Sequence, residues 1–185
     1  MLDTNLTDEQ IIECLKTGET SRYFEVLYDR YRQRVYEKCM GFVKDRRTAE
    51  ELLEDIFSKV FEKIPSFQQK SSFSTWLYTI VYNHCIDYLR LKKKLHYPNW
   101  DSMQDMAEIV DNVELENDIS IENMLNIMEL VHPEEKALLN MKYMDNLSLK
   151  QIGQALRISE SATKMRLKRA RTRFLLLFKQ KYLNK

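Results

Sequence analysis

A run of basic residues near the C-terminus is the part of the sequence best suited to binding a charged partner. The stretch SESATKMRLKRARTRF, Ser159 to Phe174, holds six Lys or Arg in sixteen positions and one acid, Glu160. The whole chain of 185 residues has a formal net charge of only +1. Because Lys and Arg neutralise phosphates and release their counterions, this concentration of positive charge indicates a polyanionic partner such as nucleic acid.

The charge of the chain is divided into blocks of opposite sign. Ten bases and one acid from Arg157 to Lys185 give a net charge of +9, whereas seven acids without a base from Leu95 to Ser120 give −7. A second basic cluster, RLKKK, spans Arg90 to Lys94. Two basic blocks separated by an acidic strip indicate two contacts with one polyanion and a linker between them. Alternatively, each basic block is only a solvated helix surface. This interpretation is disfavoured because both basic blocks lie at the ends of helical segments.

Residues suited to other chemistry are scattered. Cys14, Cys39 and Cys85 are odd in number and include no CxxC pair, which argues against a disulfide framework and a zinc site. The chain has no glycine-rich phosphate loop and no nucleophile motif, and Glu134 and Glu135 are interpreted as helix-surface carboxylates. We therefore expect no enzyme activity, no cofactor and no metal.

The pattern of apolar residues predicts an all-α fold of two small helical domains. Three Gly and three Pro are too few turn residues for a strand-rich fold. Thr7 and Gln10 have the spacing of a capping box for the first helix. In the first domain, residues 1–94, helices are expected over 8–16, from Ser21, from a cap at Thr48 to Pro65, and from Phe73 to the RLKKK cluster. Gly41 and Asp45 to Arg47 are expected to form a short turn before Thr48.

An extended acidic linker is expected over residues 95–119, where Pro98, many acids and weak periodicity argue against a helix. The second domain, residues 120–185, is expected to be a second group of helices. Its first helices are predicted from Ile121 to Val131 and from Pro133 to about Met144, with the proline in the first turn.

The end of the second domain has the pattern of a helix-turn-helix. Ser148 is expected to cap a short helix, Arg157 turns the chain, and Ser159 caps a longer basic helix. In that motif the second helix enters the major groove with its N-terminal residues toward the bases. Two faces are expected on it, an inward one with Leu167, Ala170 and Phe174, and a basic one with Lys164, Lys168 and Arg171.

Sequence preference would come from the start of the basic helix. The candidates for base contacts are Glu160, Ser161, Thr163 and Lys164. Glu160 can accept a hydrogen bond from a cytosine amine or can stabilise the helix dipole, and both interpretations stay open.

Three stretches of the chain, in this order, resemble the extracytoplasmic-function sigma factors of bacterial RNA polymerase. YFEVLYDRYRQRVYEKCMGFVKDRRTAEELLEDIFSKVFEKIPSF is similar to the polymerase-binding helices, and SSFSTWLYTIVYNHCIDYLRLKKK to the helix that melts and reads the minus-ten element. LSLKQIGQALRISESATKMRLKRARTRF is similar to the helix-turn-helix that reads the minus-thirty-five element. The resemblance implies a factor that binds core RNA polymerase and directs promoter-specific transcription initiation.

The resemblance implies three sets of contact residues, and an acidic linker that follows the RNA-exit path of the polymerase. The set for core polymerase is Glu51, Glu54, Asp55 and Lys59. The set for the minus-ten element, with a loop that receives a flipped base, is Gln68, Gln69, Lys70, Ser71, Ser72, Asn83, His84, Asp87, Arg90, Lys92, Lys93 and Lys94. The set for the minus-thirty-five element is Ser159, Glu160, Ser161, Thr163, Lys164, Arg166, Lys168, Arg169 and Arg171.

Some positions depart from the family pattern. Glu54 stands where the docking helix usually has Gln, and Ala162 and Thr163 stand where the recognition helix often has Thr and Val. Arg157 stands where the turn usually has Gly, so a positive φ would strain it. Trp76 could stack on an unpaired base, but its position on the apolar stripe of its helix favours a core role.

The resemblance also implies an anti-sigma factor as a partner, and we expect a monomer when the chain is free. The acidic N-terminus and the lack of a long apolar run predict a cytoplasmic protein without membrane insertion. A sigma mimic that only titrates an anti-sigma factor is disfavoured by the two basic faces. A one-domain repressor would leave residues 1–94 without a role.

Overall fold

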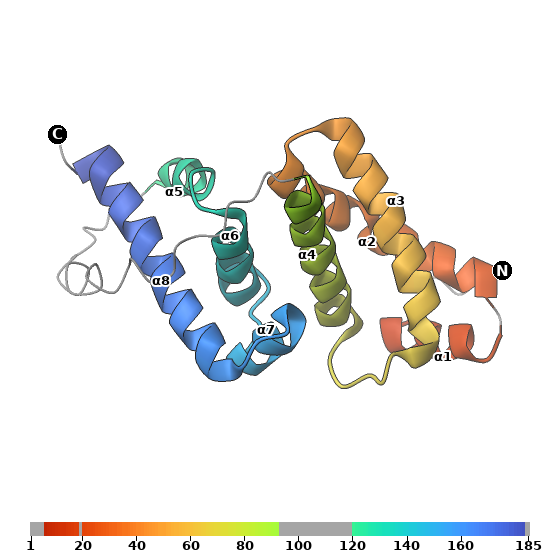
Figure 1. Cartoon of the computed structure of the whole chain (residues 1–185). Coiled ribbons are helices and arrows are strands. Elements are labelled where there is room, and N and C mark those ends of the chain that lie inside the picture. Colours follow the sequence, from red (N-terminus) through yellow and green to blue (C-terminus); the bar gives the residue numbers. More distant parts are fainter. Residues whose placement is uncertain (1–5, 19, 93–119, 184–185) are drawn as a thin grey trace. The chain divides into compact units, whose positions relative to one another are not determined.

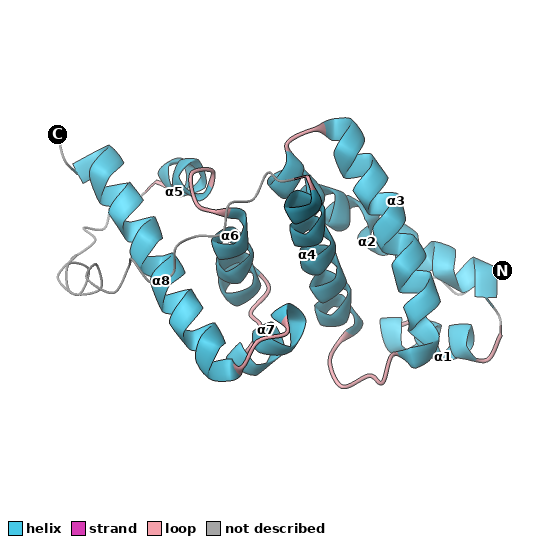
Figure 2. Cartoon of the chain, viewed as in Figure 1, coloured by secondary structure: helices cyan, strands magenta, loops and turns pink. Residues whose placement is uncertain are grey.

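The computed structural model of the chain describes residues 6–18, 20–92 and 120–183. These ranges are helices joined by short loops and hold no strand, which confirms the predicted all-α fold (Figures 1 and 2). The chain divides into two compact units, Met1–Lys92 and Lys93–Lys185, which we describe one at a time. The predicted linker over 95–119 lies outside the described residues, as do Lys93 and Lys94.

The N-terminal unit is built from four α-helices and one 3₁₀ turn. Helices α2 and α3 pack side by side, and α4 packs against both of them (Figure 1). The elements are α1 (Asp8–Lys16), α2 (Thr20–Val43), α3 (Arg46–Lys63), η1 (Ile64–Ser66) and α4 (Phe73–Leu91).

The starts of α1 and α3 are fixed by side-chain caps. The capping box at Thr7 is confirmed, because the Gln10 amide donates to Thr7 Oγ1 over 3.3 Å and the Thr7 amide donates to Gln10 Oε1 over 2.8 Å. The predicted cap at Thr48 is wrong. Asp45 caps α3 instead, accepting from the Thr48 amide over 2.8 Å, because its carboxylate reaches the third amide of the helix.

The turn predicted at Gly41 and Asp45 to Arg47 is formed by Lys44 and Asp45 alone. Gly41 is inside α2, which continues to Val43, and Lys44 then takes a left-handed conformation with φ 54°. The strong apolar periodicity on both sides of Gly41 therefore overrides its low helix propensity.

The core of the N-terminal unit is formed by the inward stripes of α2, α3 and α4. Val35, Ile56 and Leu77 are fully buried, one from each helix. Two thiols also lie in this core, since Cys39 on α2 and Cys85 on α4 are both buried with their sulfur atoms 3.8 Å apart. Their contact, together with burial, raises the pKa of the Cys85 thiol.

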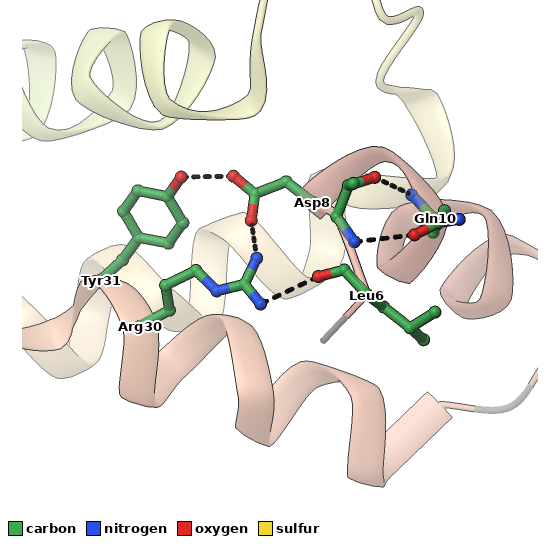
Figure 3. Close-up of polar contacts among 6 residues, drawn as sticks. Leu6, Asp8, Gln10, Arg30 and Tyr31 are labelled. Carbon is green, nitrogen blue, oxygen red and sulfur yellow. Dashed lines mark hydrogen bonds and ion pairs between the residues drawn. The ribbon is translucent and has the colours of Figure 1, made fainter. Parts of the chain in front are cut away.

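Helix α1 is attached to α2 through a carboxylate. Figure 3 shows Asp8 accepting hydrogen bonds from the Arg30 guanidinium and from the Tyr31 hydroxyl. Arg30 also donates to the Leu6 carbonyl over 3.0 Å. Asp8 is mostly buried, at 17% side-chain exposure, so the pairing fixes the start of α1 onto two successive residues of α2.

The C-terminal unit is a group of helices packed against a long final helix. Helices α6 and α7 both contact α8, and α5 contacts it near its C-terminal half (Figure 1). The elements are α5 (Ile121–Met128), α6 (Pro133–Leu139), the π-helical turn η3 (Asn140–Met144), α7 (Leu149–Leu156), α8 (Glu160–Phe178) and the π-helical turn η4 (Lys179–Leu183).

The interior of this unit is mostly apolar, with a few buried polar side chains. Ile127, Leu138 and Ile152 are fully buried or nearly so, one each from α5, α6 and α7. Glu135 on α6 is also fully buried, and Glu134 is only 5% exposed. The interpretation of this pair as ordinary surface residues is wrong, because the short helix α6 is buried along its whole length.

Candidate nucleic-acid interface

The helix-turn-helix has the predicted caps and turn. Ser148 forms a capping box with Gln151 at the start of α7, and Ser159 Oγ accepts from the Ala162 amide over 3.1 Å at the start of α8. Between them Arg157 has φ 56° and ψ 42°, the left-handed conformation that was expected to strain a residue with a Cβ. These features confirm two helices joined by a tight turn.

The contact between α7 and α8 is close enough to require glycine on α7. A Cβ built on Gly153 would lie 2.8 Å from the Ile158 carbonyl oxygen and 3.0 Å from Thr163 Oγ1. Both atoms belong to the turn and to the first turns of α8, so the packing at Gly153 sets how α8 leaves the turn.

Helix α8 has one buried face and one basic exposed face. Leu167 and Ala170 are buried as expected, while Phe174 is half-buried. Three basic residues are exposed in a row at helical spacing, and within the described residues no acid forms an ion pair with them. They are Lys164, Lys168 and Arg171. By contrast, Arg47 on α3 is neutralised by Glu51 at 3.1 Å. These three cations of α8 are thus available for phosphates.

Thr163 corrects the predicted set of base contacts. Its side chain is fully buried, and Thr163 Oγ1 donates to the Ser159 carbonyl over 2.9 Å. It lies on the face that packs against Gly153. Thr163 therefore holds the start of α8 against α7 and does not project toward a groove.

The other candidates at the start of α8 are on its outer side. Glu160 and Ser161 are exposed, and Ser161 Oγ is 3.1 Å from Ser159 Oγ. Arg166 and Arg169 are half-buried on the flanks of the exposed face. Ser159 uses its hydroxyl for the helix cap.

A loop in the N-terminal unit carries the second group of candidates. Its start is held by Lys16 of α1, whose ammonium donates to the Phe67 carbonyl over 2.8 Å. Gln68, Gln69 and Lys70 are exposed beyond this point, and Gln69 takes a left-handed conformation with φ 52°. The fixed start and the strained middle together present polar side chains outward.

The last residue of this loop caps the start of α4. Ser72 Oγ accepts from the Thr75 amide over 3.3 Å, so its hydroxyl is used as a cap. Ser71 is half-buried. Trp76 is half-buried too, and its ring centre lies 4.7 Å from that of Phe67 at the start of the loop.

Helix α4 presents a polar face along its second half. Asp87 and Arg90 are exposed and form an ion pair at 3.5 Å, and Asn83 is half-buried one turn earlier. Lys92 is exposed at the end of the helix, with its ammonium 5.8 Å from the ring centre of Tyr88.

His84 does not share that outward orientation. Its side chain is 14% exposed and turned toward α3, where the Lys59 ammonium lies 2.7 Å from Nδ1 and Asp55 lies 3.6 Å from Nε2. Burial lowers the pKa of His84, and the Lys59 ammonium lowers it further, so the site favours the neutral imidazole. The prediction of a direct minus-ten contact is therefore corrected: His84 joins α4 to α3.

The outer face of α3 has the polar residues expected of a docking surface. Its apolar side is buried in the unit, and Glu51, Glu54, Asp55 and Lys59 are all exposed. Glu54 accepts a hydrogen bond from the Tyr28 hydroxyl over 2.9 Å, which together with burial raises the pKa of Tyr28.

Comparisons with known proteins match both units to one family. The model of Sigma-70 region 2 matches residues 27–95, and the model of Sigma-70, region 4 matches residues 121–174. The chain belongs to the extracytoplasmic-function group of the sigma-70 family. Like the relatives below, this sigma factor acts in promoter-specific transcription initiation by RNA polymerase.

Two relatives from Bacillus subtilis (strain 168) carry the group name. ECF RNA polymerase sigma factor SigW is 29% identical over 170 residues, which are 86% of this chain and 90% of SigW. ECF RNA polymerase sigma factor SigX is 25% identical over 148 residues, 76% of each chain. The sigma factor RpoE, solved with the anti-sigma factor NepR from Bartonella quintana, shares the fold with a TM-score of 0.60 at 16% identity, covering 87% of this chain and 99% of RpoE.

The environments of two side chains of α8 were not predicted from the sequence. Met165 is 52% exposed on α8, and its position one turn after Ser161 could have revealed this. Arg173 lies 3.4 Å from the buried Glu135, so its guanidinium is directed toward the interior and away from the basic face. No local signal predicts that pairing, because the two residues lie on different helices.

No helix in the described ranges is long and apolar enough to cross a bilayer. In the same ranges, no group of three His, Cys, Asp or Glu side chains is placed to hold a metal ion.

Proposed function

We propose that this sigma factor binds core RNA polymerase with its N-terminal unit and reads both promoter elements, one with each unit. The observation that carries the proposal is the exposed row of Lys164, Lys168 and Arg171 on a helix whose opposite face is buried. Because these cations have no acidic partner in the described part of the chain, they suit phosphates, and the start of α8 suits base edges.

We assign the proposed minus-thirty-five contacts to side chains on the outer side of α8. Lys164, Lys168 and Arg171 would bind backbone or base edges, and Arg166 and Arg169 would flank them. Ser161 and Glu160 lie at the helix start that meets the bases, and Ser159 supports them through the cap. A bidentate contact or a close charged contact of this kind contributes about 1–3 kcal/mol to discrimination.

For the minus-ten element, we propose that the loop after Phe67 receives a flipped base. Gln68, Gln69 and Lys70 are exposed where the Lys16 contact holds the backbone, and Ser71 and Ser72 close the loop. Extruding a base costs a few kcal/mol, so such a loop must return hydrogen bonds to its edges. Asn83, Asp87, Arg90 and Lys92 of α4 would contact the upstream part, with Lys93 and Lys94 beyond the described residues.

Docking on the polymerase would use Glu51, Glu54, Asp55 and Lys59 of α3. The domain limits that we propose are 1–94 for the polymerase and minus-ten unit, 95–119 for an acidic linker and 120–185 for the minus-thirty-five unit. We further propose a non-enzymatic cytoplasmic monomer held by an anti-sigma factor, supported by the solved complex of RpoE with NepR.

The test is assembly with bacterial core RNA polymerase on size-exclusion chromatography, followed by run-off transcription from a promoter library. The proposal expects co-elution and promoter-dependent transcripts. Co-elution without any transcript from the library would point to a mimic that occupies polymerase or an anti-sigma factor. Tight DNA binding without co-elution would support a repressor and overturn the proposal.

A further inference from the structure

The exposed face of α8 contains one large apolar side chain among its basic residues. Met165 is 52% exposed, and no other apolar residue of α8 is as exposed. Scattered exposed apolar residues are common on protein surfaces and need no explanation by themselves. Its place on the helix distinguishes Met165 from these.

Helix geometry places Met165 at the centre of the surface that would enter the groove. At 3.6 residues per turn, it lies about 40° around the axis from Ser161 and about 60° from Lys168. Both neighbours are exposed, as is Lys164 beside it. Thr163, one of the four residues predicted to read bases, is buried on the opposite side. Met165 occupies the outward position that Thr163 does not.

The chemistry of this position selects one kind of base edge. In the major groove each base pair offers hydrogen-bond donors and acceptors, and thymine alone adds a C5-methyl group. A thioether is a poor hydrogen-bond partner but a flexible and polarizable apolar group. Placed against a polar base edge, Met165 would desolvate groups without satisfying them, which disfavours those bases.

We propose that Met165 is a specificity-determining residue of α8 that contacts the C5-methyl group of a thymine in the minus-thirty-five element. The inference rests on the proposed function of α8 and adds one base preference to it. Lys164 and Lys168 supply phosphate binding around the methionine, so Met165 contributes discrimination and little general affinity.

The experiment uses the full chain with core RNA polymerase on a promoter selected from the library. Each thymidine of the minus-thirty-five element is replaced in turn by deoxyuridine, which removes the methyl group and keeps every hydrogen bond. One position should lose about fourfold in complex stability with the wild-type chain, the effect expected from burial of one methyl group.

Substitutions at Met165 connect that loss to the methionine. M165S should abolish the deoxyuridine effect at that position, while M165L should keep it because leucine is also apolar. M144S is the matched control, since Met144 is a methionine of the same unit that is 75% exposed on η3, away from α8. It should leave the whole deoxyuridine profile unchanged.

Three results would overturn the inference. They are a wild-type profile without a methyl-sensitive position, a profile for M165S that equals the wild-type profile, and weaker polymerase binding by M165S without DNA. The last result would assign Met165 to a protein contact. If the wild-type chain yields no promoter-dependent transcript at all, the proposed function itself fails and the inference falls with it.

Discussion

Glu135 on α6 and Arg173 on α8 form an ion pair at 3.4 Å in which the carboxylate is fully buried and the guanidinium is 31% exposed. The backbone of His132 also interacts with this carboxylate and, like Arg173, favours its charged form. Burial raises the pKa of Glu135 to about 7, although Arg173 opposes the shift. The buried carboxyl is therefore close to half protonated at neutral pH.

The first prediction concerns the pH dependence of the C-terminal unit. A carboxyl with a raised pKa binds its proton more tightly when folded, so its ionisation lowers stability as pH rises from about 4.5 to about 7. Glu135→Gln should raise the free energy of unfolding at pH 8 by roughly 1–3 kcal/mol and change it little at pH 5. Hydrogen exchange of α6 and α8 amides at the two pH values measures this. An equal effect at both would contradict it.

A second prediction concerns DNA binding by α8. Lys164→Ala should weaken the promoter complex by roughly 1–3 kcal/mol if Lys164 reaches a base, and Arg166→Ala should do the same. Lys150→Ala is the control, because Lys150 is exposed on α7 outside the basic row. Run-off transcription and filter binding at two salt concentrations report the loss. Unchanged transcription in both variants would remove α8 from the recognition surface.

Packing between α7 and α8 gives a third prediction. Gly153→Ala should destabilise the C-terminal unit by about 1–3 kcal/mol, since the new methyl group would meet the Ile158 backbone at 2.8 Å. Gly41→Ala, inside α2 with nothing within 4 Å of its Cβ, should instead add about 0.5–1 kcal/mol. Thermal unfolding of both variants tests the contrast, and equal shifts would argue against the clash.

The left-handed turn residue gives a fourth prediction. Arg157→Gly should stabilise the helix-turn-helix by about 1 kcal/mol, because glycine adopts φ 56° without a steric cost. Arg157→Ala keeps the Cβ and should give no such gain. Hydrogen exchange of the Ile158 amide, which donates to the Gly153 carbonyl over 2.9 Å, reports the local effect. Equal protection in the two variants would show that the turn is not strained.

A fifth prediction concerns promoter melting. Lys16→Gln removes the ammonium that holds the Phe67 carbonyl, so the loop that follows should lose its fixed start. We expect slower formation of the open complex with little change in polymerase binding. Permanganate footprinting of unpaired thymines measures the open complex. Lys63→Gln is the control, as Lys63 is an exposed lysine at the end of α3. Normal melting by Lys16→Gln would show that the contact is dispensable.

Local patterns in the sequence predicted the helices and most of their caps. Thr7, Ser148 and Ser159 cap the helices that they were expected to cap, because an N-cap depends on residues within one turn. The cap of α3 was misplaced because Asp45 and Thr48 both suit that role, and only the backbone decides between them.

Side-chain direction was harder to predict at the candidate sites. Thr163 and His84 are polar, yet each turns inward toward a neighbouring helix. Which face of a helix is covered depends on how helices pack, and periodicity leaves that open for residues at the edge of the apolar stripe. Glu135 and Arg173 meet from distant positions for the same reason.

The placement of the cysteines allows their modification to report local opening of the N-terminal unit. Cys39 and Cys85 are sealed in the core of the N-terminal unit, Cys14 is half-buried on α1, and the sequence has no cysteine beyond residue 85. Modification of Cys39 and Cys85 requires that unit to open, since buried thiols are inaccessible and react poorly. Timed alkylation of the natural protein would thus report opening of the N-terminal unit alone, without any engineered label.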